Sequence, residues 1–177
     1  EQIKKDKTEV LELSTRFHRH SLPIPEYICG STLKLYYKMI FLLKEFVGKN
    51  KQVFIFCPTI AICETVYKLV SLFIRKGNCV HSKKENRAAI INDFKNKKYM
   101  YLVTTAVLER GVTVKDLQVI VFLADHRIYD EYALIQIAGR AGRKLDAPEG
   151  KVIFLVNKVS EAVEKCVSSI SNSNFNM

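Results

Sequence analysis

The sequence lacks the segments by which a chain holds a nucleotide phosphate or crosses a membrane on its own. A phosphate-binding loop of the form G-x-x-x-x-G-K-S/T is absent, because the one Gly48-Lys49 pair is followed by Asn50 and has no upstream glycine. No apolar run approaches the roughly 18 residues of a membrane span, and no signal peptide precedes the charged start EQIKKDK. We therefore expect a soluble, cytoplasmic protein that cannot bind ATP through a P-loop of its own.

Metal and redox motifs are missing as well. The five cysteines and four histidines include no C-x-x-C pair and no spacing typical of metal ligands or a catalytic triad. Cys57 ends the apolar run VFIFC, where a cysteine is usually a small core residue. Asp125-His126 follows a predicted strand, but with no P-loop beside it we do not expect a Mg²⁺ site there. The expectation is reduced thiols and no protein-bound metal.

Positive charge dominates what is present. The 177 residues carry a formal net charge of +10, and 48% of them are hydrophobic. This length suits one domain with a real core, and the charge favours nucleic acid, ATP phosphates or an acidic membrane surface as partner. A lysine-rich solvated surface would give the same charge, and both interpretations apply to the lysines of 83–98. The net charge favours a negatively charged class of partner but does not identify which one binds.

Short apolar runs alternate with helical patterns along the chain. Runs that are apolar on both faces are typical of a parallel sheet covered by helices, and they occupy residues 51–57, 78–82, 99–105, 118–124 and 151–156. Apolar residues at intervals of three and four predict helices at 31–47, 59–76, 83–96 and 130–143. The alternation predicts a doubly wound α/β domain.

The ends of the chain lie outside this alternation. Residues 1–29, which include RFHRHSLPIPE, are expected to form an extended arm, residues 30–170 the domain, and the polar residues 171–177 a frayed tail. Doubly wound folds bind ligands in the loops beyond the carboxyl ends of their strands. Those loops begin with PT, HSKKENR, TTAVLERG and ADHRIYDE, and the last leads into QIAGRAGR.

QIAGRAGR is the first candidate site. Arg140 and Arg143 are three positions apart, so a helix would place both guanidinium groups on one side, where they match phosphate oxygens in a bidentate manner. Gly139 and Gly142 each cost a helix about 1 kcal/mol, which suggests close approach of a ligand, although a helix end would also explain them. Gln136, one turn earlier, would orient Arg140 or contact the ligand. The alternative is a pair of ordinary surface arginines.

TTAVLERG is the second candidate and follows a predicted strand. Thr104 and Thr105 place hydroxyl and backbone N–H groups at the strand end, a suitable cradle for a nucleic-acid phosphate. Arg110 and Gly111 follow them. Threonine pairs are common at strand ends and Glu109 would pair with Arg110 on a surface, so this stretch alone does not identify a ligand.

Together, in order and separation, these stretches resemble motifs V and VI of superfamily 2 helicases, with TTAVLERGVTVKDLQVIVF followed by QIAGRAGR. KQVFIFCPT, which contains Thr59, is similar to the motif IV region, and VHSKKENRAAIINDFKNKKYMYLVTT, which contains Arg87, to the segment that links it to motif V. The resemblance covers about residues 50–156. It implies a RecA-like parallel sheet with helices on both faces, the C-terminal lobe of a helicase.

The resemblance also implies a role for each candidate residue. Arg140 and Arg143 become arginine fingers that act on ATP, while the ATP and its Mg²⁺ are held mainly by an N-terminal P-loop lobe that the chain lacks. The remaining candidates divide into two groups: Gln136, Gly139, Arg110 and Gly111 beside the nucleotide, and Thr59, Arg87, Thr104 and Thr105 on nucleic acid. Two other classes stay open, a small-molecule enzyme of the same fold and a non-catalytic binding module.

LERGVT, ADH and ALIQIAGRAGR, with the arm RFH…LPIPE, resemble the motor lobe of the ComFA family of competence ATPases. This implies a translocase for uptake of single-stranded DNA, in the cytoplasm or peripheral at the inner face of the plasma membrane. Its implied partners are single-stranded DNA, the P-loop lobe and other DNA-uptake proteins, with oligomerisation left open.

An alternative within the superfamily and several departures qualify this resemblance. A PriA- or RecG-like DNA helicase lobe is the alternative within the superfamily. Thr113 replaces the Asp of DEAD-box proteins, which disfavours an RNA helicase of that kind. The family's four-cysteine module is missing and the chain begins without Met, so we expect the second lobe of a longer protein.

Overall fold

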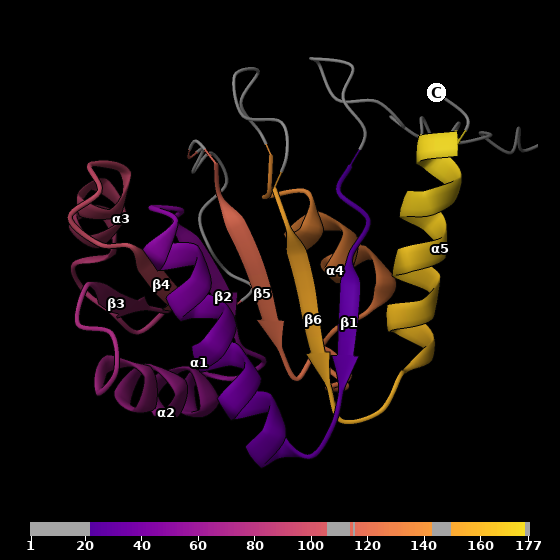
Figure 1. Cartoon of the computed structure of the whole chain (residues 1–177), viewed down its shortest axis with the longest axis horizontal. Helices are drawn as coiled ribbons and strands as arrows, with labels where there is room; N and C mark the ends of the chain where they lie inside the picture. Colours follow the sequence, from indigo (N-terminus) through magenta and orange to yellow (C-terminus); the bar gives the residue numbers. More distant parts are fainter. Residues whose placement is uncertain (1–21, 106–113, 115, 143–149, 176–177) are drawn as a thin grey trace, which may run out of the picture.

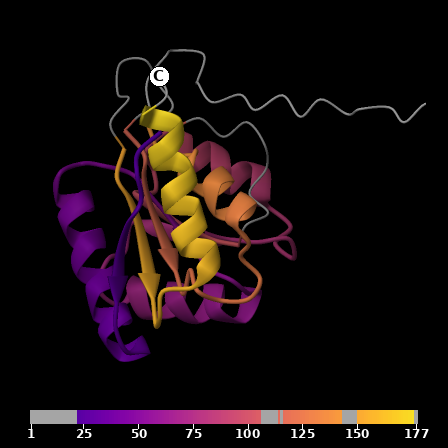
Figure 2. The same ribbon diagram turned by 90° about the vertical axis from the view of Figure 1, so that its right-hand side faces the viewer.

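The computed structural model describes residues 22–105, 114, 116–142 and 150–175. Within these residues, six strands form a single sheet in the order β1-β6-β5-β2-β4-β3, and every neighbouring pair is parallel. Helices pack on both faces of this sheet (Figures 1 and 2). The predicted α/β fold is confirmed. Among the described residues, no helix has the length and apolar character needed to cross a membrane.

The strands are short, and the four that have a neighbouring strand on each side are buried throughout. In chain order the strands are β1 (Glu26–Cys29), β2 (Val53–Phe56), β3 (Gly77–Val80), β4 (Tyr101–Thr104), β5 (Gln118–Phe122) and β6 (Val152–Val156). The helices are α1 (Thr32–Gly48), α2 (Ile60–Ser71), α3 (Arg87–Lys95), α4 (Glu131–Ala138) and α5 (Glu161–Phe175). Because helices cover both sides of these strands, their sequences are mostly apolar and do not alternate.

Helices α1 and α2 cover one face of the sheet, and α3, α4 and α5 cover the other. Leu35 and Met39 of α1 are fully buried and belong to the same core as Ile55 of β2. On the opposite face, Phe54 of β2 stacks on Phe94 of α3, with ring centroids 5.0 Å apart. Successive side chains of β2 therefore enter two different cores, as the pleat of a strand requires.

The domain is longer at both ends than the sequence indicates. Residues 26–29, which the sequence places in the arm, form β1 and pair in parallel with β6. Residues 171–175, expected to be a frayed tail, continue α5, where the side chain of Asn174 donates to the carbonyl oxygen of Leu22 at 2.8 Å and accepts from its N–H at 3.0 Å. An exposed edge strand and a helix rich in serine and asparagine both lack a clear apolar pattern, which explains why neither was predicted.

Candidate functional site

The carboxyl ends of β2, β4 and β3 bring three predicted ligand loops side by side. Phe56 of β2 and Val80 of β3 both pair with Thr104 at the end of β4, and the N–H of Cys57 donates to the Thr104 carbonyl oxygen at 2.7 Å. On its other side β2 pairs with β5, and the helices that follow β2 and β5 pack on opposite faces of the sheet. Doubly wound folds bind ligands at such a divergence.

Two threonine hydroxyl groups at this edge already form hydrogen bonds with the backbone. Thr59 caps the N-terminus of α2, and its Oγ1 accepts from the N–H of Ile62 at 3.2 Å. The Oγ1 of Thr104 donates to the carbonyl oxygen of Thr105 at 3.1 Å, and these two residues are only 1% and 8% exposed. The hydroxyl groups of Thr59 and Thr104 therefore maintain local structure, and Thr104 is too buried to be the first contact of a ligand at this edge.

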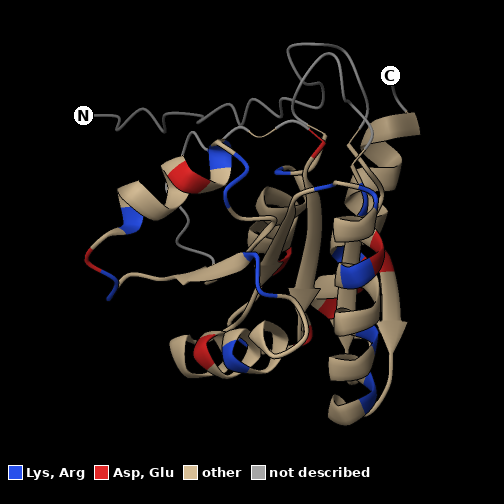
Figure 3. Ribbon diagram, turned by 60° about the vertical axis from the view of Figure 1, so that its left-hand side comes forward, with Lys and Arg blue, Asp and Glu red and all other residues tan. Residues whose placement is uncertain are grey.

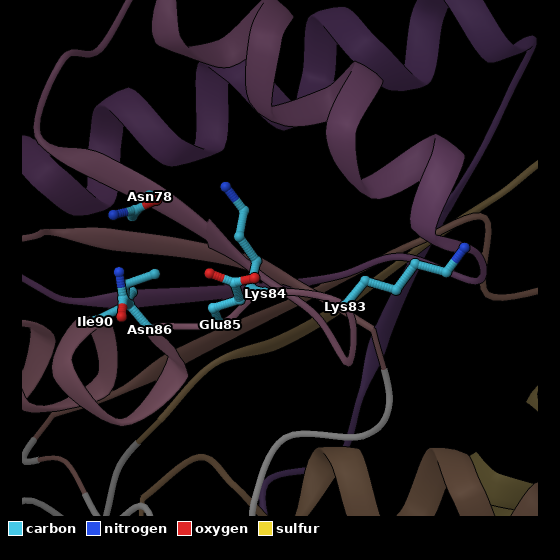
Figure 4. Close-up of a pocket in the computed structure, with 6 residues that line it drawn as sticks. All are labelled: Asn78, Lys83, Lys84, Glu85, Asn86 and Ile90. Atoms are coloured by element: carbon cyan, nitrogen blue, oxygen red, sulfur yellow. The ribbon is translucent and has the colours of Figure 1, made fainter.

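A basic hollow lies next to these strand ends, at the start of α3. Arg87 is the half-buried first residue of α3. The hollow beside the first turn of α3 has a volume of about 500 Å³. In Figure 4 the side chains of Lys83 and Lys84 diverge from the loop that follows β3. The hollow is lined by Asn78, Lys83, Lys84, Glu85, Asn86 and Ile90. Two lysines against one carboxylate give a lining suited to phosphate groups.

Residues 139–142, here called the arginine turn, do not continue the helix. α4 ends at Ala138, and the N–H of Arg140 donates to the carbonyl oxygen of Ile137 at 3.0 Å. The predicted helix over 130–143 is therefore too long at its carboxyl end. Gly142 has a φ of 57°, in the left-handed region that favours glycine, and it closes the turn that follows the helix. Arg143 lies outside the described residues.

The arginine turn lies at the amino end of the sheet. A Cβ built on Gly150, just before β6, would lie 2.6 Å from the nitrogen of Gly142 and 2.7 Å from the carbonyl oxygen of Leu117, just before β5. Because α4 runs back along the sheet after β5 ends, it carries the turn away from the strand-end loops. The structure thus separates two groups of candidate residues that the sequence suggested would gather at one edge.

Two of the other nucleotide candidates, Gln136 and Gly139, lie on α4 and at its C-cap. Gln136 is exposed on α4, one turn before the half-buried Arg140. Gly139 is the C-cap of α4 with a φ of −61°, which is ordinary helical geometry that other residues adopt. Arg110 and Gly111 lie outside the described residues. The structure therefore places Gln136, Gly139 and Arg140 along one helix end.

The loop between β5 and α4 is anchored to its neighbour. Asp125 accepts hydrogen bonds from the N–H groups of Asn157 at 3.1 Å and Lys158 at 3.3 Å, which ties this loop to the one after β6. The side chain of Asn157 in turn donates to the carbonyl oxygen of Gly30 at 3.0 Å. The described residues contain no cluster of three or more His, Cys, Asp and Glu that could hold a metal ion.

Two polar pairs between α2 and the end of β3 were not singled out from the sequence. The sulfur atoms of Cys63 and Cys79 are 3.2 Å apart, and this hydrogen bond, together with burial, raises the pKa of Cys79. His81 is 6% exposed, with its Nε2 3.4 Å from Oε1 of Glu64. The partners lie on different elements, so no local spacing in the sequence indicates either pair.

Comparison with known proteins connects this geometry to a family. Residues 37–144 match the family model described as the helicase conserved C-terminal domain. The competence protein ComFA of Streptococcus pneumoniae is 31% identical over 173 residues, which cover 93% of this chain and 40% of that protein. ComFA of Bacillus subtilis is 32% identical over 151 residues, covering 81% and 33%. The chain thus spans no more than 40% of the length of these two relatives.

A solved structure agrees on the fold. Dbp5 of S. cerevisiae, in a structure bound to RNA and ADP BeF3, superposes with a TM-score of 0.65 at 18% sequence identity. The match covers 90% of this chain and 42% of the Dbp5 chain. At this identity the likeness concerns the fold, and it matches the RecA-like sheet that the sequence indicates.

Proposed function

The chain belongs to the helicase conserved C-terminal domain family, where its sequence is of the ComFA type, and on that premise we propose that it is the second motor lobe of an ATP-driven DNA translocase. In this proposal a separate P-loop lobe holds ATP and Mg²⁺. The lobe described here supplies arginines to the nucleotide and a basic edge to single-stranded DNA. The two ComFA relatives are named competence proteins, and we propose the same setting, uptake of DNA in transformation, for this one.

The observation that carries the proposal is the division of the candidate residues between two places. The strand-end loops and the basic hollow lie at the carboxyl ends of β2, β4 and β3. The arginine turn packs beside Leu117 and Gly150, at the amino ends of β5 and β6. A translocase must bind nucleotide and DNA at different sites, so that ATP hydrolysis at one site changes the affinity for DNA at the other. A small-molecule enzyme would gather its polar groups in one cavity.

Arginine suits the role proposed for the turn. Negative charge on the γ-phosphate oxygens is stabilised in the transition state by a positioned guanidinium, which needs no proton transfer. An arginine finger contributes on the order of 10³–10⁵ in rate to phosphoryl transfer in related systems. A positioned guanidinium needs a backbone of defined geometry. Arg140 has one, because it lies between the end of α4 and the left-handed Gly142.

The DNA side of the proposal depends on positive charge. The chain carries a net charge of +10, and Lys83 and Lys84 line the hollow beside α3. Phosphate contacts of this kind position a strand without reading its sequence. A translocase has to pass along any sequence, so contacts of this kind suit it.

ATP hydrolysis by the full-length protein, measured with and without single-stranded DNA, tests the proposal. We expect turnover to rise when DNA is added and fall back when a nuclease removes it. The lobe alone should hydrolyse no ATP, because it has no P-loop to hold the β-phosphate and Mg²⁺. Turnover by the full-length protein that is indifferent to DNA, or turnover by the lobe alone, would contradict the proposal.

A further inference from the structure

One side of α1 exposes large apolar and aromatic side chains. Leu33, Tyr37 and Phe41 recur every four residues and are 83%, 68% and 54% exposed. Phe73, just beyond the end of α2, is 53% exposed, and Nζ of Lys44 on α1 lies 5.4 Å from the centre of its ring. We call Leu33, Tyr37, Phe41 and Phe73 the α1 stripe. Large apolar side chains that are exposed together on one side of an element often mark a binding site.

The α1 stripe is not needed to hold α1 in place. The opposite side of the helix is buried against the sheet through Leu35, Met39, Leu43 and Phe46. These four side chains are at most 4% exposed. Since that side provides the packing, the exposed aromatic rings contribute little to the core, and their presence points to a partner.

Positive charge surrounds the α1 stripe. The helix carries Lys34, Lys38 and Lys44, and Nζ of Lys38 lies 6.0 Å from the centre of the Phe41 ring. Glu45 is the one acidic residue of α1, and it forms an ion pair of 2.6 Å with Lys49. Basic residues recur along α1 in Figure 3. The partner is therefore expected to be negatively charged and to offer flat apolar surface.

We propose that the α1 stripe binds single-stranded DNA, as a contact surface separate from the strand-end loops. Bases stack on aromatic side chains without regard to sequence, while lysines neutralise the phosphates between them. At 1.5 Å per residue, Leu33, Tyr37 and Phe41 repeat about every 6 Å along α1, so successive bases can each meet one of them. The proposal rests on the motor function proposed above, which brings a single strand to this lobe.

Two other occupants fit the stripe less well. A symmetric contact with a second copy would place the lysines of one α1 against those of the other. A helix that lies on an anionic membrane separates its apolar side from its charged side. Here the two are interleaved, because Lys38 and Lys44 hold their ammonium groups against the rings of Phe41 and Phe73. Aromatic rings mixed with cations suit bases and phosphates.

Fluorescence anisotropy of a labelled oligothymidylate, titrated with this chain at low salt, tests the proposal. The double variant Tyr37→Ala/Phe41→Ala should bind the probe at least about tenfold more weakly, as expected when two stacking rings are lost. Tyr132→Ala is the matched control, because Tyr132 is a 73% exposed aromatic residue on α4, away from the stripe. It should bind as the parent does.

Lys34→Glu is a second variant that keeps the rings. It should also weaken binding and should make the affinity less dependent on salt, because one phosphate contact is lost. Circular dichroism of each variant checks that the lobe is folded. If the ring variant and Lys34→Glu both bind oligothymidylate like the parent, the proposal is overturned. It is also overturned if they lose only binding to vesicles of equal parts phosphatidylglycerol and phosphatidylcholine.

The outcomes separate this inference from the motor proposal. If DNA stimulates ATP hydrolysis by the full-length protein and the stripe variants bind DNA normally, the motor proposal stands and the stripe proposal is wrong. If DNA binding depends on the stripe but DNA does not stimulate ATP hydrolysis by the full-length protein, the motor proposal is wrong and the stripe remains a DNA-binding surface.

Discussion

A methyl group on Gly150 would come within 2.6 Å of the backbone nitrogen of Gly142, so two glycines from different loops pack backbone against backbone. Ala141 and the carbonyl oxygen of Leu117 lie just as close, each at 2.7 Å. This contact fixes the end of α4 against the starts of β5 and β6. The position of Arg140 therefore depends on a glycine that lies ten residues further along the chain.

Gly150→Ala should destabilise the lobe. The added methyl group meets backbone on two sides, and overpacking of this kind costs about 1–3 kcal/mol. Thermal unfolding followed by circular dichroism should show a lower midpoint for this variant. Gly48→Ala is the control, because a Cβ on Gly48 has nothing within 4 Å and alanine favours a helix by up to about 1 kcal/mol. A Gly150→Ala midpoint equal to that of the parent would contradict the packing described.

Cysteine reactivity should divide sharply between one exposed and four buried thiols. Cys29 is exposed, whereas Cys57, Cys63, Cys79 and Cys166 are buried. Burial raises the pKa of Cys166 to about 12, so near pH 8 it lacks the thiolate that reacts. Mass spectrometry after iodoacetamide treatment should find one adduct on the native lobe, and five after unfolding in denaturant. Rapid labelling of Cys166 in the native lobe would show that the core around α5 is open.

Binding of single-stranded DNA by the lobe should depend strongly on salt and little on sequence. Each phosphate contact with a single strand contributes about −0.7 to the slope of log affinity against log salt. Lys83→Ala, in the basic hollow beside α3, should lower the magnitude of this slope by about one such contact. Anisotropy titrations over a range of salt concentrations measure the slope. Binding that is insensitive to salt would show that phosphate contacts do not hold the strand.

The buried parts of the fold could be predicted from the sequence more readily than its borders. VFIFC indicated β2 because both of its faces are buried, and this leaves no polar alternation to obscure the run. β1 was missed because an edge strand with exposed residues has no such run. The predicted helix over 59–76 was too long because Leu72 and Phe73 continue the apolar spacing, although α2 ends at Ser71 and both are exposed.

The site could be predicted only in part, for a related reason. Thr104 at the end of β4 and Thr59 just beyond β2 lie at neighbouring strand ends, because the loops of a parallel sheet open at one edge. The arginine turn lies elsewhere because its position depends on where α4 ends. Beyond that end, the left-handed Gly142 and its contact with Gly150 hold the turn in place. Such a contact joins two loops and has no signature in a local stretch of sequence.

DNA-stimulated ATP turnover by the full-length protein carrying Arg140→Ala tests the central claim most directly. Turnover should fall by about 10²-fold or more, the scale of losing one positioned donor to the transition state. Arg140→Lys should restore little of it, because lysine keeps the charge but loses the planar fork. Arg75→Ala, which removes an exposed arginine from the loop before β3, should turn over ATP like the parent. If Arg140→Ala also hydrolyses ATP at the parental rate, Arg140 does not act on the nucleotide, and the role proposed for the arginine turn is wrong.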